Sequence, residues 1–251
     1  MFIPTIDDVR NYWNERGRDV RLGCPNFGVR RYFEDIEDRH YRDESHVPAF
    51  AQFGRWDGKK VLIIGCGIGT EAINFAKAGA RLTVIDVSSE RLAVCQQRFE
   101  AYALKAQFYL GNAEILDRVV PVEQYDLIYS SGVLHYTPSP YRVLESVKKY
   151  MGASTELRLI VSSKWSWQPG ETRPGCPVAY TFSARELRKG LLRDFKVQNL
   201  TKANIAGRLS WMPKPLFGVM ERLLGRRTLI VASLEIPVSY QATLRVERRA
   251  A

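Results

Sequence analysis

The chain has 251 residues, of which 45% are hydrophobic, and it carries 37 lysines and arginines against 27 acidic residues. This composition excludes a disordered or fibrous chain and suffices for one large domain with a buried core. The apolar runs fall far short of the roughly 20 residues of a membrane-spanning helix. The four cysteines stand apart, without a CxxC pair. We therefore expect a cytoplasmic protein with reduced thiols and no bound metal.

The charge is distributed unevenly along the chain. Residues 1–125 hold 17 basic and 18 acidic groups, whereas residues 126–251 hold 20 and 9. A basic half is compatible with nucleic acid, a membrane surface, an anionic substrate or simple solubility. The interleaved basic and aromatic residues typical of RNA binding are missing from the sequence, so nucleic acid is disfavoured as a partner.

Residues 1–57 have helical patterns. Thr5 begins a Thr-x-x-Asp sequence that resembles a capping box and predicts a short helix through Tyr12 and Trp13. Ser45 is expected to cap a later short helix that reaches Phe53. We interpret this region as an N-terminal helical cap or lid.

From residue 58 the chain alternates between strand and helix patterns. Residues 61–64 form a short, wholly apolar run, as expected for a strand that is covered on both faces in a parallel sheet. Further strands are predicted at 82–85, 107–110, 127–130 and 157–161. The helix before the last of these has Val143, Leu144, Val147 and Met151 at helical spacing. This rhythm predicts an α/β fold with a Rossmann-like, doubly wound sheet.

The last third of the chain continues the pattern after a long loop. Ser183 and Glu186 form a capping box, and the helix that follows should reach about Asp194. Two more strands are predicted at 196–201 and 228–234, with a helix between them. We expect a mostly parallel sheet with an antiparallel last strand, a domain over 58–234 with a helical insertion at 202–227, and a C-terminal tail at 235–251.

A glycine loop, Gly65-Cys66-Gly67-Ile68-Gly69-Thr70, joins the first predicted strand to its helix. Glycines let the backbone turn sharply and approach a ligand closely, and the helix start offers free N–H groups. Asp86 stands 21 residues after Gly65, at the end of the second strand, where a carboxylate can accept both hydroxyls of a ribose. Together they predict an adenosine-containing cofactor, without separating NAD from S-adenosylmethionine.

Five segments follow one another in a recognisable order. They are Val61–Thr70, Val84–Ser88, Gly111–Glu114, Tyr125–Ser130 and Gly132–Thr137. In this order they resemble the class I S-adenosylmethionine-dependent methyltransferases of the small-molecule type. The resemblance implies S-adenosyl-L-methionine as cofactor, S-adenosyl-L-homocysteine as product, and no metal. The chain departs from the family at Ile63, where an acidic residue usually stands.

The resemblance also implies roles for individual residues. Gly65, Gly67 and Gly69 would pass beneath the methionine part of the cofactor, and Asp86 would hold the ribose. Along the rest of the cofactor, the implied contacts are Val87 on the adenine, Asn112 and Ala113 at its edge, and Ser130 beside the sulfonium.

Methyl transfer from a sulfonium is an in-line displacement, so alignment and a dry site are the main requirements. His135, directly after the fourth strand, is our candidate general base, and a structural role is equally open. Tyr12 is the second catalytic candidate, as part of the lid. His40 and His46 are expected to be structural or surface groups. The substrate pocket is expected to include Trp13, Trp165 and Trp167.

The sequence thus predicts methyl transfer to an N or O atom of a small-molecule metabolite, for example in secondary metabolism, by a monomer or homodimer. Two alternatives stay open. One is a membrane-peripheral methyltransferase of a lipid or quinone-like acceptor, because residues 211–227 are basic and amphipathic. The other is an RNA-associated protein with the methyltransferase fold.

Overall fold

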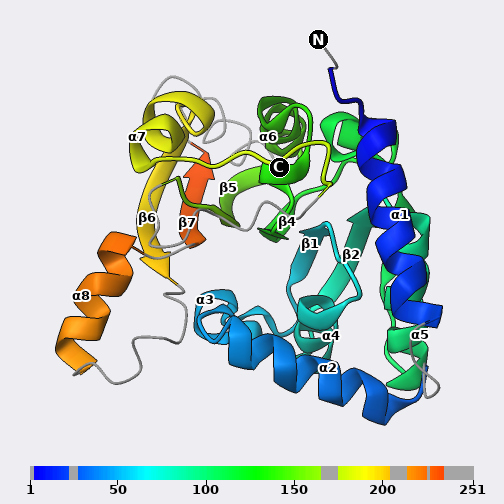
Figure 1. Ribbon diagram of the computed structural model, residues 1–251. Helices are drawn as coiled ribbons and strands as arrows, with labels where there is room; N and C mark the ends of the chain where they lie inside the picture. Colours follow the sequence, from blue (N-terminus) through cyan, green and yellow to red (C-terminus); the bar gives the residue numbers. More distant parts are fainter. Residues whose placement is uncertain (1–2, 23–27, 165–174, 204–213, 225–226, 235–251) are drawn as a thin grey trace, which may run out of the picture.

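The computed structural model describes residues 3–22, 28–164, 175–203, 214–224 and 227–234. Within these residues, seven strands form one sheet in the order β3-β2-β1-β4-β5-β7-β6 (Figure 1). The strand β7 runs antiparallel to both β5 and β6, and the remaining neighbours are parallel. The predicted fold class is therefore confirmed. Trp165, Trp167 and the predicted tail lie outside the described residues.

The strands follow the apolar runs of the sequence closely. They are β1 (Lys60–Ile64), β2 (Arg81–Asp86), β3 (Gln107–Leu110), β4 (Tyr125–Ser131), β5 (Met151–Ser162), β6 (Phe195–Ala203) and β7 (Arg227–Leu234). The prediction for Met151 was wrong, because this residue is not in a helix and instead opens β5 opposite Tyr125. Met151 is buried in the strand, as it would be on the apolar face of a helix, so the spacing of apolar residues could not distinguish a helix from a strand at this position.

Helices cover both faces of the sheet. One face carries α4 (Thr70–Lys77) and α5 (Ser89–Ala101), with α1 (Ile6–Leu22) beside α5 and α2 (Arg30–Asp43) along α4 (Figure 1). The other face carries α6 (Pro140–Lys148) and the short helices η2 (Ala113–Arg118) and η3 (Leu134–Tyr136). The remaining helices are α3 (Val47–Ala51), η1 (Phe53–Trp56), α7 (Ala184–Glu186), η4 (Leu187–Leu191) and α8 (Lys214–Leu224).

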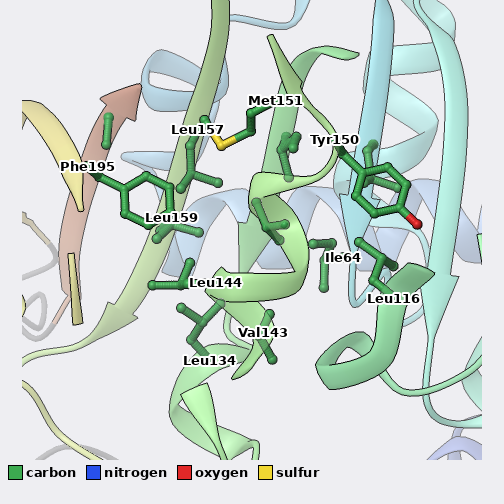
Figure 2. Close-up of a cluster of buried hydrophobic side chains, with 14 of the residues drawn as sticks. Ile64, Leu116, Leu134, Val143, Leu144, Tyr150, Met151, Leu157, Leu159 and Phe195 are labelled. Atoms are coloured by element: carbon green, nitrogen blue, oxygen red, sulfur yellow. The ribbon is translucent and has the colours of Figure 1, made fainter. Parts of the chain in front are cut away.

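Successive residues of β1 pack into different cores because side chains alternate along a strand. Leu62 and Ile64 belong to the core under α6, whereas Val61 and Ile63 belong to the core under α4 and α5. Figure 2 shows the first of these cores, in which side chains of α6 and of β5 meet, including Leu144. Burial on both sides explains why β1 is apolar from Val61 to Ile64, and it holds the loop after β1 in place.

The predicted helix starts have mixed outcomes. The Thr5–Asp8 capping contacts are present, and the helix they start, α1, runs well past Trp13 to Leu22. The prediction of a Ser45 cap is wrong, because α3 begins at Val47 behind His46 and uses no side-chain cap. The Ser183–Glu186 capping box is confirmed, but its helix ends at Leu191 as a π-helical turn.

A buried arginine ties three of the helices together. Arg98 of α5 is fully buried. Its guanidinium donates hydrogen bonds to the Glu37 carboxylate and the Phe33 carbonyl of α2, and at 3.0 Å to the Thr70 hydroxyl at the start of α4. Arg98 therefore helps to fix the position of α2 relative to the glycine loop, together with hydrogen bonds of Tyr41 to Thr70 and Asn74 of α4.

Candidate active site

A cavity of about 390 Å³ lies at the carboxyl ends of the parallel strands, where loops after β1, β2, β3 and β4 converge. We call one part the nucleotide end; it is lined by Gly65, Gly67, Asp86, Val87, Asn112 and Ala113. We call the other part the α2 end; it is lined by Ile36, His40, Glu44, Glu71, Ile160 and Arg227. Because β3 and β7 stand on opposite sides of β1 in the sheet, Asn112 and Arg227 mark opposite limits of the cavity.

The glycine loop forms the floor of the nucleotide end. Gly65 has φ +76°, and a Cβ placed there would lie 2.0 Å from Cγ2 of Val133. Gly69 has φ +81° and is the N-cap of α4, where a Cβ would lie 2.7 Å from Sγ of Cys95. A side chain at Gly65 would thus displace Val133 from the cavity wall. Gly69 does not line the cavity, and a side chain there would disturb the packing of α4 on α5.

Asp86 sits at the end of β2 and is only 7% exposed. Its carboxylate accepts hydrogen bonds from the backbone N–H of Gly67 at 3.0 Å and of Ser88 at 2.9 Å. Burial raises the pKa of the Asp86 carboxyl, while the Ser88 and Gly67 hydrogen bonds and the charge of Arg91 lower it, and the net direction is upward. Oδ2 accepts from Gly67 and from the Cys66 thiol, whereas Oδ1 accepts from Ser88 and retains a lone pair, so Asp86 can hold the glycine loop and still accept from a ligand hydroxyl.

The wall after β3 is fixed by side-chain hydrogen bonds. Asn112 accepts from the N–H of Glu114 at 2.9 Å. Glu114 in turn accepts from the Thr137 hydroxyl and the Ser139 N–H, both at 2.8 Å, which ties η2 to the segment after η3.

Ser130 does not line the cavity. Its hydroxyl is buried within the sheet and donates to the carbonyl of Ile64 at 3.0 Å, whereas the next residue, Ser131, does line the cavity. The alternation of side chains along β4 explains this difference from the expected position.

The helix α1 covers the cavity through Trp13, Val9 and Ile6. The ring of Trp13 meets that of Tyr136 edge to face, with centroids 5.3 Å apart, and the Arg91 guanidinium lies 4.1 Å from the centre of the Trp13 ring. The lid role expected of the N-terminal region is thus compatible with the placement of Trp13.

Tyr12 lies away from the cavity. It is buried in a cluster with Val9 and Val178, and the guanidinium of Arg16 lies 3.6 Å from the centre of its ring. Successive residues of a helix point about 100° apart, and here Trp13 faces the cavity while Tyr12 packs in the cluster with Val178. The structure therefore gives Tyr12 a packing position, and not the direct contact with the cavity that we expected.

His135 lines the cavity from η3 and is 1% exposed. Its carbonyl accepts a hydrogen bond from the N–H of Tyr180 at 2.8 Å, which brings the segment before α7 alongside η3. The neighbouring ring of Tyr136, which the sequence did not single out, lines the cavity as well.

The α2 end was not predicted. His40, expected to be structural, lines the cavity, and its Nε2 lies 3.2 Å from Oε1 of Glu71. Arg227 donates to Glu44 at 3.0 Å, across 183 residues of sequence.

His46 is not among the residues that line the cavity, and burial lowers its pKa. Within the described residues, no three His, Cys, Asp or Glu side chains are grouped as metal ligands.

Residues 61–152 match the sequence model of a methyltransferase domain. The chain is 32% identical over 97 residues to a ubiquinone biosynthesis O-methyltransferase of Glaesserella parasuis serovar 5 (strain SH0165). This alignment covers 38% of the chain and 41% of that protein. A protein of the same name from Pseudomonas fluorescens (strain Pf0-1) is 34% identical over 89 residues, covering 36% and 38%. The matches thus span about two fifths of the length of these relatives.

Solved structures share the fold over much more of the chain. Magnesium protoporphyrin IX methyltransferase from Synechocystis PCC 6803, solved with bound S-adenosylmethionine, superposes with a TM-score of 0.61 over 92% of this chain and 98% of its own, at 20% identity. An S-adenosylmethionine-dependent methyltransferase from Mesorhizobium loti gives 0.58 over 74% and 96%, at 18% identity.

Residues 61–152 are thus similar to a methyltransferase domain, and the chain shares the fold of S-adenosylmethionine-dependent methyltransferases of known structure.

Changing Gly65 to alanine should weaken S-adenosylmethionine binding about tenfold or more, because the new methyl group would push Val133 out of the cavity wall. Gly58→Ala is the matched control, since Gly58 also has a positive φ, +68°, but open space around it. Each variant should lose roughly 1–3 kcal/mol of stability from backbone strain. Calorimetry gives the affinities; equal affinity for the two variants would contradict the steric argument.

Proposed function

We propose that the protein transfers the methyl group of S-adenosylmethionine to an N or O atom of a small-molecule acceptor. The observation that carries this proposal is the cavity itself. Residues 61–152, which match a methyltransferase domain, supply its nucleotide end, and α2 and β7 contribute polar side chains to the other end, which we assign to the acceptor. The ubiquinone biosynthesis relatives are named O-methyltransferases, which supports oxygen as the atom that accepts the methyl group. We further propose a cytoplasmic monomer or homodimer whose methyltransferase domain spans 58–234.

The residues at the nucleotide end fit an adenosine cofactor. A Cβ at Gly65 would clash with Val133, so the absence of a side chain lets the loop and Val133 form one continuous wall of the cavity. Asp86 offers acceptor lone pairs for ribose hydroxyls, and Val87 and Val133 offer apolar contact for a base. When bound, the cofactor supplies an electrophilic methyl group.

The chain's own contribution is then alignment and exclusion of water. Trp13 and Tyr136 cover the cavity with aromatic surface, and the end of β4 and η3 supply Ser131 and His135 to its wall. His135 stays a candidate for holding or moving a proton. Ser130 and Tyr12, away from the cavity, are proposed only as residues that keep the sheet and the lid in place.

Isothermal titration calorimetry should show one S-adenosylmethionine and, in a separate titration, one S-adenosylhomocysteine bound per chain. NAD and NADH should give no measurable heat. The physical reason is the combination of the glycine loop and Asp86 with the downstream segments that match a methyltransferase domain. Binding of NAD without binding of S-adenosylmethionine would refute the proposed function.

A lipid or quinone-like acceptor at a membrane surface is the second candidate. In α8, Val219 and Leu223 are 52% and 60% exposed, and Arg222 beside them is exposed as well. In the described parts of the chain, no helix combines the length and apolar character needed to cross a bilayer. Flotation of the protein with anionic vesicles would favour this candidate over a dissolved acceptor.

A further inference from the structure

The α2 end contains a paired histidine and glutamate that the cofactor motifs leave unused. His40 comes from α2 and Glu71 from the first turn of α4, and both line the cavity. The side chains are 29% and 15% exposed, so they face the cavity without being freely solvated. The inference drawn from this pair rests on the proposed methyl transfer.

The pair is held in a fixed geometry. Nε2 of His40 lies 3.2 Å from Oε1 of Glu71. One and two turns earlier on α2, Glu37 and the Phe33 carbonyl accept from Arg98, which also donates to Thr70, the residue before Glu71. One guanidinium thus contacts both helices that supply the pair, and Tyr41 of α2 joins them again through Thr70 and Asn74.

This geometry suits a proton acceptor. A carboxylate beside Nε2 favours the tautomer with hydrogen on Nε2, which leaves the lone pair on Nδ1. It also stabilises the imidazolium that forms when Nδ1 takes a proton. Ile36, Val47 and Ile160 also line the cavity, so apolar side chains are available to contact a flat ring.

Charged groups surround His40 from several elements. The carboxylates are Glu44 on its own helix and Glu71 on α4, and the cations are Arg98 on α5 and, when protonated, His46 before α3. Glu44 is itself paired with Arg227 of β7. Burial lowers the pKa of His40, while the hydrogen bond and charge of Glu71 and the charge of Glu44 raise it, and the net direction is upward.

We propose that the methyl acceptor is a phenol that binds at the α2 end, and that His40, positioned by Glu71, takes the proton of its hydroxyl. The phenolic oxygen forms the new bond to the methyl carbon, the sulfur–methyl bond breaks, and its electron pair returns to sulfur. The phenolic proton moves to Nδ1 of His40 and then to solvent when the product leaves. A phenol has a pKa of about 10, within reach of an imidazole, whereas an aliphatic hydroxyl, like water at about 15.7, is not.

The test uses catechol, a phenol without an acidifying substituent, as the probe, and the full-length protein. His40→Gln should lower kcat on the order of a hundredfold at saturating S-adenosylmethionine, while its affinity for that cofactor changes less than threefold. Glu71→Gln should shift the acid limb of the kcat–pH profile to lower pH, because loss of the carboxylate lowers the pKa of His40. Glu145→Gln, on the surface of α6, is the charge-matched control and should change neither quantity.

A second readout needs no turnover. The chain has three histidines, so protein labelled with ¹³C at histidine gives three imidazole signals, assigned with His40→Gln, His46→Gln and His135→Gln. In the parent the His40 signal should titrate above its ordinary value of about 6.5, and in Glu71→Gln it should titrate lower. His46→Gln should leave the acid limb of the kcat–pH profile in place.

Several results would overturn the proposal. The first is a kcat of His40→Gln equal to that of the parent. The second is an acid limb of the kcat–pH profile that moves in His135→Gln but not in Glu71→Gln. The third is a parent protein that binds S-adenosylmethionine but does not methylate the probe. A tenfold loss of cofactor affinity in His40→Gln with unchanged kcat would instead assign His40 to the cofactor. Failure of the parent to bind S-adenosylmethionine would refute the proposed function itself, and calorimetry separates the two failures.

Discussion

Replacing Arg98 by methionine should lower the free energy of unfolding by about 3–5 kcal/mol, the range for removing one partner of a buried ion pair. Arg98 is fully buried, and its guanidinium serves Glu37, Phe33 and Thr70 at once. Methionine fills a similar volume but leaves the Glu37 carboxylate with only the longer contact to Lys77, at 3.5 Å. Urea denaturation followed by circular dichroism measures the loss.

Two further variants make this prediction specific. Arg31→Met removes an arginine of α2 whose ion pair with Asp35 is largely exposed, and it should change stability by less than about 1 kcal/mol. Adding Glu37→Gln to Arg98→Met should restore part of the lost stability, because the Glu37 carboxylate that had lost its guanidinium partner is replaced by a neutral amide. A loss equal to that of Arg31→Met would show that the buried network does not stabilise the fold.

The same substitution should also affect the α2 end. Arg98 connects the helix that carries His40 to the start of the helix that carries Glu71. Its removal is therefore expected to loosen the spacing of that pair more than the nucleotide end, where Asp86 and the glycine loop are joined by their own hydrogen bond.

The nucleotide end could be predicted from sequence because its signals are local. The apolar run of β1, the glycines after it and Asp86 at the end of β2 lie within one stretch of chain, and parallel pairing of β1 with β2 brings them together. The mostly parallel sheet and its antiparallel last strand, β7, were also predicted and are confirmed.

The α2 end depends on contacts that no local pattern announces. His40 and Glu71 are 31 residues apart, and Glu44 and Arg227 are 183 apart. A histidine on a polar helix has the same sequence signature whether it faces solvent or a cavity. The side-chain direction of Tyr12 and Ser130 was missed for a related reason, since a shift of one residue along a helix or strand turns the side chain to another face.

Asp86→Ala should weaken S-adenosylmethionine binding by roughly 1.5–3 kcal/mol, the scale of hydrogen bonds to a charged group. That corresponds to about a 10- to 150-fold rise in Kd, measurable by calorimetry. The sequence alone suggests a small cost in stability for a strand-end carboxylate that faces a ligand. The structure indicates a larger one, because the N–H groups of Gly67 and Ser88 lose their acceptor. Removing a buried carboxylate whose pKa is raised offsets part of that loss.

The chain offers a matched control for Asp86 at the opposite edge of the sheet. Asp126, near the start of β4, also accepts a backbone hydrogen bond, from the N–H of Lys60 at 2.9 Å, but it does not line the cavity. Asp126→Ala should therefore reduce stability while leaving the Kd for S-adenosylmethionine unchanged. If both alanine variants bind the cofactor as well as the parent does, Asp86 does not contact the ribose, and its carboxylate serves only to shape the glycine loop.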